Sequence, residues 1–343
     1  MKEKLGKLLK YSLSAALAAA LLYLAFRKVE WTEFSRELAV CDWGYILLSM
    51  LAGTVAFAIR GVRWKQILMP LDSGTELLTT VNGVNISNMA NLFIPFCGEF
   101  VRSGIVTRRS TRDASTGKPV VTYDRALGTA ALERFWDILS VIILLAVLLI
   151  FKRDQFSGFL VEKVWNPVFG HMHLVGFFAL VLLTGLIVAG CFAIRHYSER
   201  YRICGRIYGV ICRLLEGFSS CLHMKGKGLF FIYTLLIWAM YWLQMVLIAK
   251  AMPSVSGVML EDALFLMLIG SFASCLPVPG GFGAYHYIVS VAMSSIYGFP
   301  REGVGIAFAT ISHESQAVTM VVTGLASYVS ECLRRKGPQK QVN

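Results

Sequence analysis

The sequence predicts an all-α polytopic membrane protein with six full spans and two re-entrant broken-helix hairpins, arranged as an inverted repeat. Three observations lead to this prediction. Hydrophobic residues make up 56% of the 343-residue chain and charged residues only 16%, which is typical of membrane proteins. Two otherwise apolar segments are interrupted by proline and glycine. The basic residues are distributed unevenly along the chain.

Six apolar stretches are long enough to cross a bilayer, although the second is marginal in length. They lie near residues 8–26, 43–59, 126–150, 174–194, 228–249 and 303–330. The first has a basic start like a signal sequence, but Arg27 and Lys28 follow it directly, without a small-residue cleavage site. We therefore expect an uncleaved first span.

Two further apolar segments, residues 76–109 and 260–298, contain helix breakers near their middle. In the second, two prolines and three glycines fall within the seven residues "PVPGGFG", 277–283. Unpaired backbone groups are costly in lipid, so such a break is tolerated only inside protein or beside water. Each segment is therefore predicted to enter and leave the membrane on the same side.

The distribution of basic residues supports this topology. With both interrupted segments treated as hairpins, 24 of the 33 Lys and Arg residues lie in segments on one side of the membrane and eight on the other. The positive-inside rule assigns the richer side to the cytoplasm, so that both termini are cytoplasmic. The net charge of +12 is then a feature of membrane topology. No aromatic–basic pattern indicates nucleic-acid binding.

The two interrupted segments share the pattern P-x-x-G-x-F, at residues 95–100 and 277–282. Each half of the chain then consists, in order, of two spans, a hairpin and a third span. Because three crossings is an odd number, the second half is inverted in the membrane relative to the first. Inverted repeats with broken helices build midplane substrate sites in many transporters. The predicted halves are residues 1–155 and 156–343, with a cytoplasmic amphipathic connector at 200–218.

Four short segments carry a resemblance to a known family: "IRGVRW" (59–64), "NLFIPFCGEFVR" (91–102), "ERFWD" (133–137) and "LPVPGGFGAYH" (276–286). Over about residues 5–335, the chain resembles the transmembrane, flippase-like region of lysylphosphatidylglycerol synthases and their stand-alone relatives. Because the sequence shows no soluble aminoacyl-transferase domain, the resemblance implies lipid translocation rather than lipid synthesis. Relatives commonly carry an acidic residue shortly after the PGG-x-G turn, where this chain has His286 between two tyrosines.

The first hairpin offers a candidate anion site. A half-helix beginning at Gly98 would point free N–H groups toward the middle of the membrane. Glu99 and Arg102 lie i, i+3 on one face, so Arg102 would bind a lipid phosphate while Glu99 orients it. A self-contained salt bridge at a hinge is the alternative. The glycines of the second hairpin would let backbone approach a head group closely, or would only form a tight turn.

Ionisable residues also lie where two long spans begin or end. Glu133 and Asp137 are i, i+4 and share one face, while Arg134 points about a third of a turn away. An arginine of the first hairpin or Arg134 would neutralise one carboxylate, and the other would carry a transported proton. A purely structural ion network is the alternative. Arg60 and Arg63 would hold phosphate, or would only anchor the topology.

A third group is titratable near neutral pH. His286, His313 and Glu314 are the obvious titratable set of the second half. Histidine, with an unperturbed pKa of about 6.5, is a plausible proton acceptor. A buried histidine whose hydrogen bonds are satisfied within the fold is the alternative. If relatives use their carboxylate to handle a proton, this chain would use His286 for that purpose or would not handle a proton at this position.

The predicted substrate-binding residues are Arg60, Arg63, Asn91, Pro95, Gly98, Glu99, Arg102, Glu133, Arg134, Asp137, Pro279, Gly280, Gly281, Gly283, His286 and Glu314. The sequence contains no HExxH, GxSxG, P-loop or dinucleotide pattern, so no catalytic residue, cofactor or metal is predicted.

The predicted function is a flippase- or scramblase-like transporter that moves a phospholipid or a polyprenyl-phosphate lipid between leaflets without ATP hydrolysis. One alternative is a membrane-embedded transferase that uses a lipid-phosphate donor. The other is a non-catalytic membrane partner of a separately encoded lipid-modifying enzyme. The expected partners are membrane lipids with anionic or zwitterionic head groups, and not nucleic acid. The expected location is the plasma (inner) membrane.

Overall fold

The computed structural model describes residues 29–166, 192–255, 257–273 and 276–334, together with Tyr23, Gly185, Ala189 and Gly190. The predicted span at 8–26 and most of the one at 174–194 lie outside these residues. Within the described ranges every regular element is a helix, apart from an isolated β-bridge in the loop after residue 109. The all-α class is therefore confirmed for this part of the chain.

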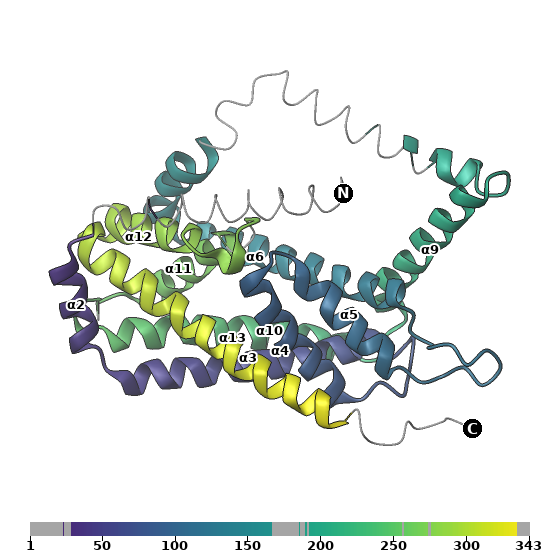
Figure 1. The fold of residues 1–343 in the computed structure, drawn as a ribbon. Helices are drawn as coiled ribbons and strands as arrows, with labels where there is room; N and C mark the ends of the chain where they lie inside the picture. Colours follow the sequence, from purple (N-terminus) through teal and green to yellow (C-terminus); the bar gives the residue numbers. More distant parts are fainter. Residues whose placement is uncertain are drawn as a thin grey trace, which may run out of the picture.

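Figure 1 shows the helices of the described ranges. The first are α2 (Trp31–Val40), α3 (Trp43–Leu68), α4 (Leu77–Phe93), α5 (Cys97–Arg109) and α6 (Tyr123–Phe159), which continues as a π-helix over Leu160–Trp165. The others are α9 (Arg202–His223), α10 (Lys227–Ala251), α11 (Leu260–Ala273), α12 (Ala284–Tyr297) and α13 (Ile306–Arg334). Short 3-10 or π turns cover Pro253–Val255, Pro279–Gly281 and Arg301–Gly305.

Three described helices are long and apolar enough to cross a membrane, by length and composition. They are α3, α10 and α6 with its extension to Lys163. They coincide with the spans predicted at 43–59, 228–249 and 126–150. The span predicted at 303–330 is also one continuous helix, α13, but it is more polar and is not among these three.

A polar seam explains the composition of α13. Asn82 of α4 donates to a carboxylate oxygen of Glu331 at 3.0 Å, and Asn85 donates to the hydroxyl of Ser327 at 2.9 Å. Buried amides need hydrogen-bond partners, and here α13 supplies them from within the protein. We call these four residues the α4–α13 seam.

Each interrupted segment is a hairpin of two short helices. α4 and α5 have 17 and 13 residues, and α11 and α12 have 14 each. At 1.5 Å per residue they measure about 20–25 Å, less than the roughly 30 Å hydrocarbon core of a bilayer. The first hairpin turns at Pro95 and Phe96, which has a left-handed φ of 60°. In the second, Gly280, Gly281 and Gly283 have φ of 57°, 74° and 80°, which only glycine adopts readily.

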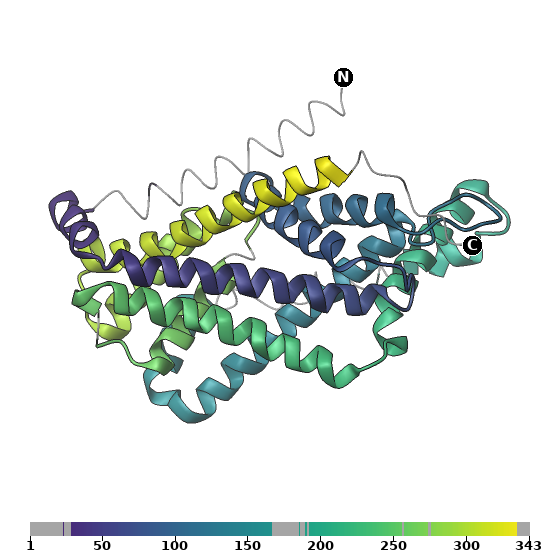
Figure 2. The same ribbon diagram turned by 90° about the horizontal axis from the view of Figure 1, so that it is seen from below.

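The helix ends gather at two ends of the molecule (Figures 1 and 2). One end holds the last turns of α3, α5 and α13 and the first turns of α4, α6 and α10. There Gln66 donates to the carbonyl of Gly226 at 2.7 Å. The other end holds α2, the starts of α3 and α11, and the end of α10, where the N–H of Asp42 donates to the carbonyl of Ala251 at 2.8 Å. Most of the described basic segments that were assigned to the cytoplasm belong to the first end.

The two hairpins start from opposite ends and their tips meet. α4 packs against the turn Pro279–Gly281 of the second hairpin. The side chain of Leu92 lies so close to Gly280 that an added Cβ would be 3.1 Å from it. The breaks in the two helical segments are therefore neighbours in space, although they are far apart in the sequence.

The packing of the two hairpins follows the same order. α3 packs against α4 as α10 packs against α11, and α5 packs against α6 as α12 packs against α13. In addition, α4 packs against α13 as α11 packs against α6. α3 and α10 lie side by side along much of their length (Figure 2). This order is expected of halves related by a two-fold axis, but the boundary at residue 155 stays a prediction.

The largest apolar core lies between α6 and α10–α13. Phe156 stacks on Phe265 with ring centroids 4.2 Å apart, and both rings are fully buried. Burial of such a ring contributes about 2–3 kcal/mol. A second cluster surrounds Trp64 and Phe230 and borders the charged residues described next.

Candidate functional site

A buried ion network joins α3, α5 and α6. Glu133 of α6 accepts from Arg60 at 3.5 Å, from Arg63 at 3.0 Å and, in a short contact, from Arg102. Asp137, one turn further, accepts from Arg60 at 3.0 Å and from Arg63 at 2.6 Å. The predicted shared face of the two carboxylates is therefore confirmed, and both carboxylates are paired with arginine.

Further contacts hold these arginines in place. The Arg60 guanidinium donates to the Tyr241 hydroxyl at 3.4 Å, and Arg63 donates to Thr234 at 3.3 Å. Arg102 lies over the ring of Trp64 at 4.7 Å, a cation–π contact. Glu133 and Arg63 are fully buried, so neither charge would be tolerated without these partners.

The first hairpin uses its charges differently from the sequence prediction. Glu99 accepts from Arg134 at 2.6 Å, whereas Arg102 turns away from Glu99 to Glu133. Arg134 points away from the shared face of Glu133 and Asp137, as expected from its place on the helix. The cluster thus contains four arginines and three carboxylates, a formal surplus of one positive charge.

The N-terminus of α5 is largely satisfied within the protein. The helix begins at Cys97, and the N–H of Gly98 donates to the Asn91 side-chain oxygen at 2.7 Å. Gly98 packs so closely on α4 that a Cβ would overlap the carbonyl oxygen of Ser87. Gly98 therefore allows the two helices of the hairpin to approach each other, and its N–H is not directed at a ligand.

A cavity of about 610 Å³ lies between the two hairpin tips. We call it the central cavity. Eight of the sixteen predicted residues line it: Arg60, Asn91, Pro95, Glu99, Arg134, Asp137, Gly280 and Gly281. The other eight do not: Arg63, Gly98, Arg102, Glu133, Pro279, Gly283, His286 and Glu314. Most of the remaining wall is apolar, so the charged residues occupy one part of an otherwise hydrophobic space.

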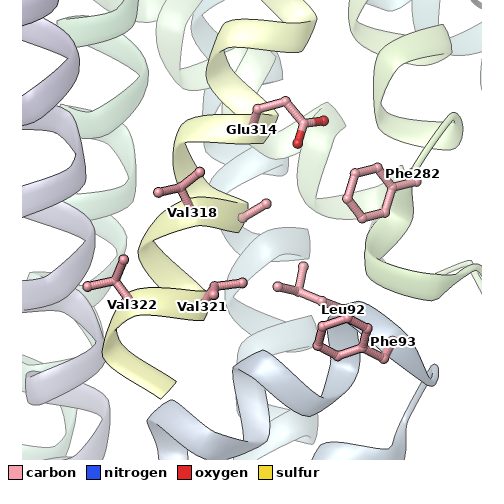
Figure 3. A pocket seen from close by; sticks show the side chains of 8 residues that line it. Leu92, Phe93, Phe282, Glu314, Val318, Val321 and Val322 are labelled. Atoms are coloured by element: carbon pink, nitrogen blue, oxygen red, sulfur yellow. The ribbon is translucent and has the colours of Figure 1, made fainter. Parts of the chain in front are cut away.

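A smaller cavity of about 370 Å³ lies beside α13. Figure 3 shows Glu314 and Phe282 near one end of it and Leu92 and Phe93 near the other. The rest of the wall is formed by apolar residues of α13: Ala317, Val318, Val321 and Val322. Glu314 is the charged side chain in this apolar wall, and it is 42% exposed. We call this the lateral pocket.

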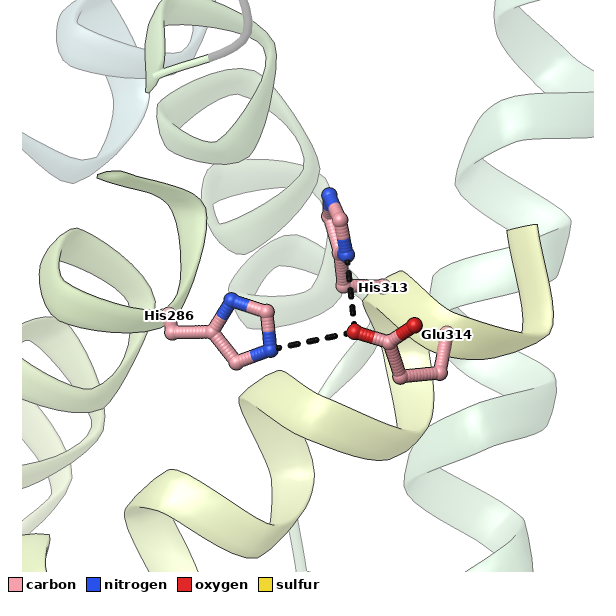
Figure 4. A group of neighbouring side chains, drawn as sticks. All are labelled: His286, His313 and Glu314. Atoms are coloured by element: carbon pink, nitrogen blue, oxygen red, sulfur yellow. Dashed lines mark hydrogen bonds and ion pairs between the residues drawn. The ribbon is translucent and has the colours of Figure 1, made fainter. Parts of the chain in front are cut away.

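The second hairpin brings His286 next to α13. His286 Nε2 lies 3.4 Å and His313 Nδ1 lies 3.3 Å from the same carboxylate oxygen of Glu314 (Figure 4). The other ring nitrogen of His313 lies 2.9 Å from the carbonyl oxygen of Gly280. Both histidines are buried. The three side chains are close enough to share one cation.

Comparison with known proteins assigns the chain to a family. Residues 11–324 match the family described as the lysylphosphatidylglycerol synthase TM region. The chain belongs to this family. A relative, the glycosyltransferase AglD of Haloferax volcanii, is 22% identical over 351 residues, covering 93% of this chain and 53% of that protein. The chain thus spans about half the length of this relative. No solved structure matches the chain.

The four segments that carried the resemblance to this family lie together in the fold. Residues 59–64, 91–102 and 133–137 supply the arginines and carboxylates of the ion network. Residues 276–286 supply the second hairpin tip and part of the cavity wall. Segments from four parts of this family member therefore build one site.

Sequence reasoning missed several polar residues of the central cavity. Trp238, Tyr241 and Gln244 follow one another at i, i+3, i+6 along α10 and line the cavity. This stripe on an otherwise apolar span was a signal that could have identified them. Asn88 also lines the cavity, and among the described residues its side-chain nitrogen has no hydrogen-bond partner.

Proposed function

We propose that this family member moves a phosphate-bearing lipid between the two leaflets of a membrane without hydrolysing ATP. The observation that carries the proposal is the central cavity. It lies between the tips of two hairpins, and these hairpins start from opposite ends of the molecule. A substrate held there would be adjacent to both breaks. Small rearrangements of one hairpin or the other would then expose it toward one end or the opposite end.

The lining of the central cavity suits the two parts of such a lipid. Arg60 and Arg134 bring guanidinium groups to the wall, and Asn88 brings an unpaired amide donor. These groups match the oxygens of a phosphate ester. The apolar remainder of the wall matches the first carbons of acyl or prenyl chains. The surplus positive charge of the cluster would be neutralised by a phosphate.

The membrane arrangement is part of the same proposal. The basic end of the molecule faces the cytoplasm, and the two hairpins enter from opposite faces as halves of an inverted repeat. α9 carries hydrophobic residues on one side and arginines on the other, which suits a helix lying on an anionic leaflet. We propose the plasma membrane as the location.

A transferase that uses a lipid-phosphate donor is the alternative, and the name of the Haloferax volcanii relative favours it. Such a reaction would need a carboxylate as general base. Glu99, Glu133 and Asp137 are each paired with arginine, which leaves none of these three poised to take a proton. We therefore place lipid translocation first.

The test uses purified protein in liposomes that contain a fluorescent phospholipid. A membrane-impermeant quencher reports the fraction of lipid in the outer leaflet over time. We expect exchange above that of protein-free liposomes, and a decrease of about 10–100-fold in Arg134→Gln, because a charge-assisted contact contributes about 1.5–3 kcal/mol.

Arg125→Gln is the matched control. Arg125 lies on the same helix, pairs with Glu216 at 2.7 Å and lies outside the central cavity. Its substitution should leave exchange within twofold of wild type. Wild-type protein that exchanges lipid no faster than empty liposomes, or that converts a lipid-phosphate donor to product, would contradict the proposal.

A further inference from the structure

The His286–His313–Glu314 cluster raises a question of proton count. The carbonyl oxygen of Gly280 can only accept a hydrogen bond, and so can an ionised carboxylate. His313 lies between two such acceptors, with Nε2 at 2.9 Å from Gly280 and Nδ1 at 3.3 Å from Glu314. A neutral imidazole carries one N–H and can donate to one of them. Both contacts are satisfied only when the cluster holds one additional proton.

The position of that proton does not alter the count. If it lies on His313, the ring is an imidazolium that donates from both nitrogens. If it lies on Glu314, the acid donates to Nδ1 while Nε2 donates to Gly280. In either case the cluster has no net charge while both histidines are buried, and charge neutrality is favoured in an apolar site.

The surroundings of His313 contain few other titratable groups. Within the described chain, the second hairpin brings His286 and Tyr285 to the ring, with centroids 4.9 and 5.0 Å away, and Tyr285 bonds Ser312. The hairpin turn adds the Phe282 ring, and α4 adds only apolar groups to the lateral pocket. Described residues of α3 and α10 make no hydrogen bond or ion pair with the ring. Glu314 on its own helix is therefore its charged partner.

We propose that His286, His313 and Glu314 form a proton-binding site whose protonation fixes the tip of the second hairpin to α13. After the proton leaves, the neutral His313 ring has one N–H for two acceptors. The contact with the ionised carboxylate is about twice as strong as one with a carbonyl, so the ring keeps Glu314 and releases Gly280. The backbone of Gly280 lines the central cavity, so loss of the proton loosens the cavity wall.

This site gives the proposed lipid translocation a coupling ion, and in that respect it rests on the proposed function. The lateral pocket supplies a second link, because Glu314 lies in its wall beside Phe282 of the hairpin (Figure 3). Each proton taken up by the cluster closes the wall of the central cavity at the second hairpin, and each proton released opens it.

The first experiment measures the proton directly. Protein labelled with ¹⁵N-histidine is studied by NMR in lipid nanodiscs, where an imidazolium is distinguished from the neutral tautomers. At neutral pH we expect one imidazolium, or one histidine hydrogen-bonded to a carboxylic acid, that is lost in His313→Gln and in Glu314→Gln. Glu314→Gln serves as the second variant because its side chain is half exposed and tolerates change. His223→Gln, an exposed histidine of α9, is the control and should keep the signal.

The second experiment measures lipid exchange in liposomes between pH 6 and 8 without a gradient. One released proton limits the slope to tenfold per pH unit, and we expect the rate to rise with pH up to that slope. His313→Gln should flatten the profile to within twofold, and His223→Gln should leave it unchanged.

The outcomes separate the two proposals. Exchange by wild type with the same pH profile in His313→Gln overturns the coupling and leaves lipid translocation standing. Absence of wild-type exchange at every pH overturns lipid translocation, and the NMR signal then decides the proton site alone. Absence of the protonated signal overturns the site. Zinc retained through dialysis at one ion per wild-type chain, and lost in His313→Gln, would replace the proton by a metal ion.

Discussion

Replacement of Glu133 by glutamine tests the energetic role of the ion network. The side chain is fully buried and accepts from three arginines: Arg60, Arg63 and Arg102. Glutamine keeps the shape but removes the negative charge, so the formal surplus of the cluster rises from one to two positive charges. Arg102 loses its carboxylate partner and keeps its hydrogen bond to the Ala130 carbonyl, at 3.3 Å, and its cation–π contact with Trp64. Removing one partner of a buried ion pair typically costs about 3–5 kcal/mol.

The expected loss is measurable as a melting shift. For a large chain, 1 kcal/mol corresponds to roughly 2 °C, so Glu133→Gln should lower the melting temperature by about 6–10 °C. Fluorescence-detected thermal unfolding in detergent measures this shift. Glu216→Gln is the control: this carboxylate is half exposed and pairs with Arg125, so its loss should cost at most about 1 kcal/mol.

A double substitution tests the physical reason. Adding Arg102→Met to Glu133→Gln removes the charge that is left without its carboxylate, and should recover part of the lost melting temperature. The network does not stabilise the fold as argued if Glu133→Gln melts within 2 °C of wild type. The same conclusion follows if adding Arg102→Met lowers the melting temperature further, by as much as an independent destabilising substitution would.

Three further outcomes are expected. Gly98→Ala should lower the melting temperature by several degrees, because a Cβ would overlap the α4 backbone, whereas Gly158→Ala, which faces open space, should change it by less than about 2 °C. Met320→Trp should narrow the central cavity and slow lipid exchange in liposomes at least tenfold without lowering the melting temperature, and unchanged exchange would argue against the cavity as the route. The pKa of Asp113, in the loop after α5, is lowered to about 2 because neighbouring hydroxyl and backbone N–H groups donate to it. Its contribution to the loop is thus present above its unfolded pKa of 3.8 and is lost as the pH falls toward 2, which an NMR titration of the loop amides will follow; loss already at pH 5 would contradict this.

Local chemistry made the hairpin breaks predictable. Two prolines and three glycines within seven residues disfavour a continuous helix, and the structure turns there with positive φ at all three glycines. The shared face of Glu133 and Asp137 was predictable for the same reason, since i, i+4 spacing on a helix fixes it. Three of the predicted spans, at 43–59, 126–150 and 228–249, coincide with described helices that are long and apolar enough to cross a membrane, whereas the more polar α13 is not among these helices.

The partners of the charged residues were not predictable from spacing. Glu99 and Arg102 have the spacing of an ion pair, yet the packing of α5 against α6 gives each a different partner. The composition of α13 depends in the same way on its neighbour, because its polar residues face the amides of α4. Such choices are made by tertiary contacts, which a single sequence does not display.

α13 forms hydrogen bonds with both hairpins. α13 holds the first hairpin through the α4–α13 seam and holds the tip of the second through His313. Because α13 is one continuous helix, we expect displacement of one hairpin to be transmitted through it to the other, so that the two hairpins do not move independently. In the proposed lipid translocation, this link would let the opening of one hairpin influence the position of the other.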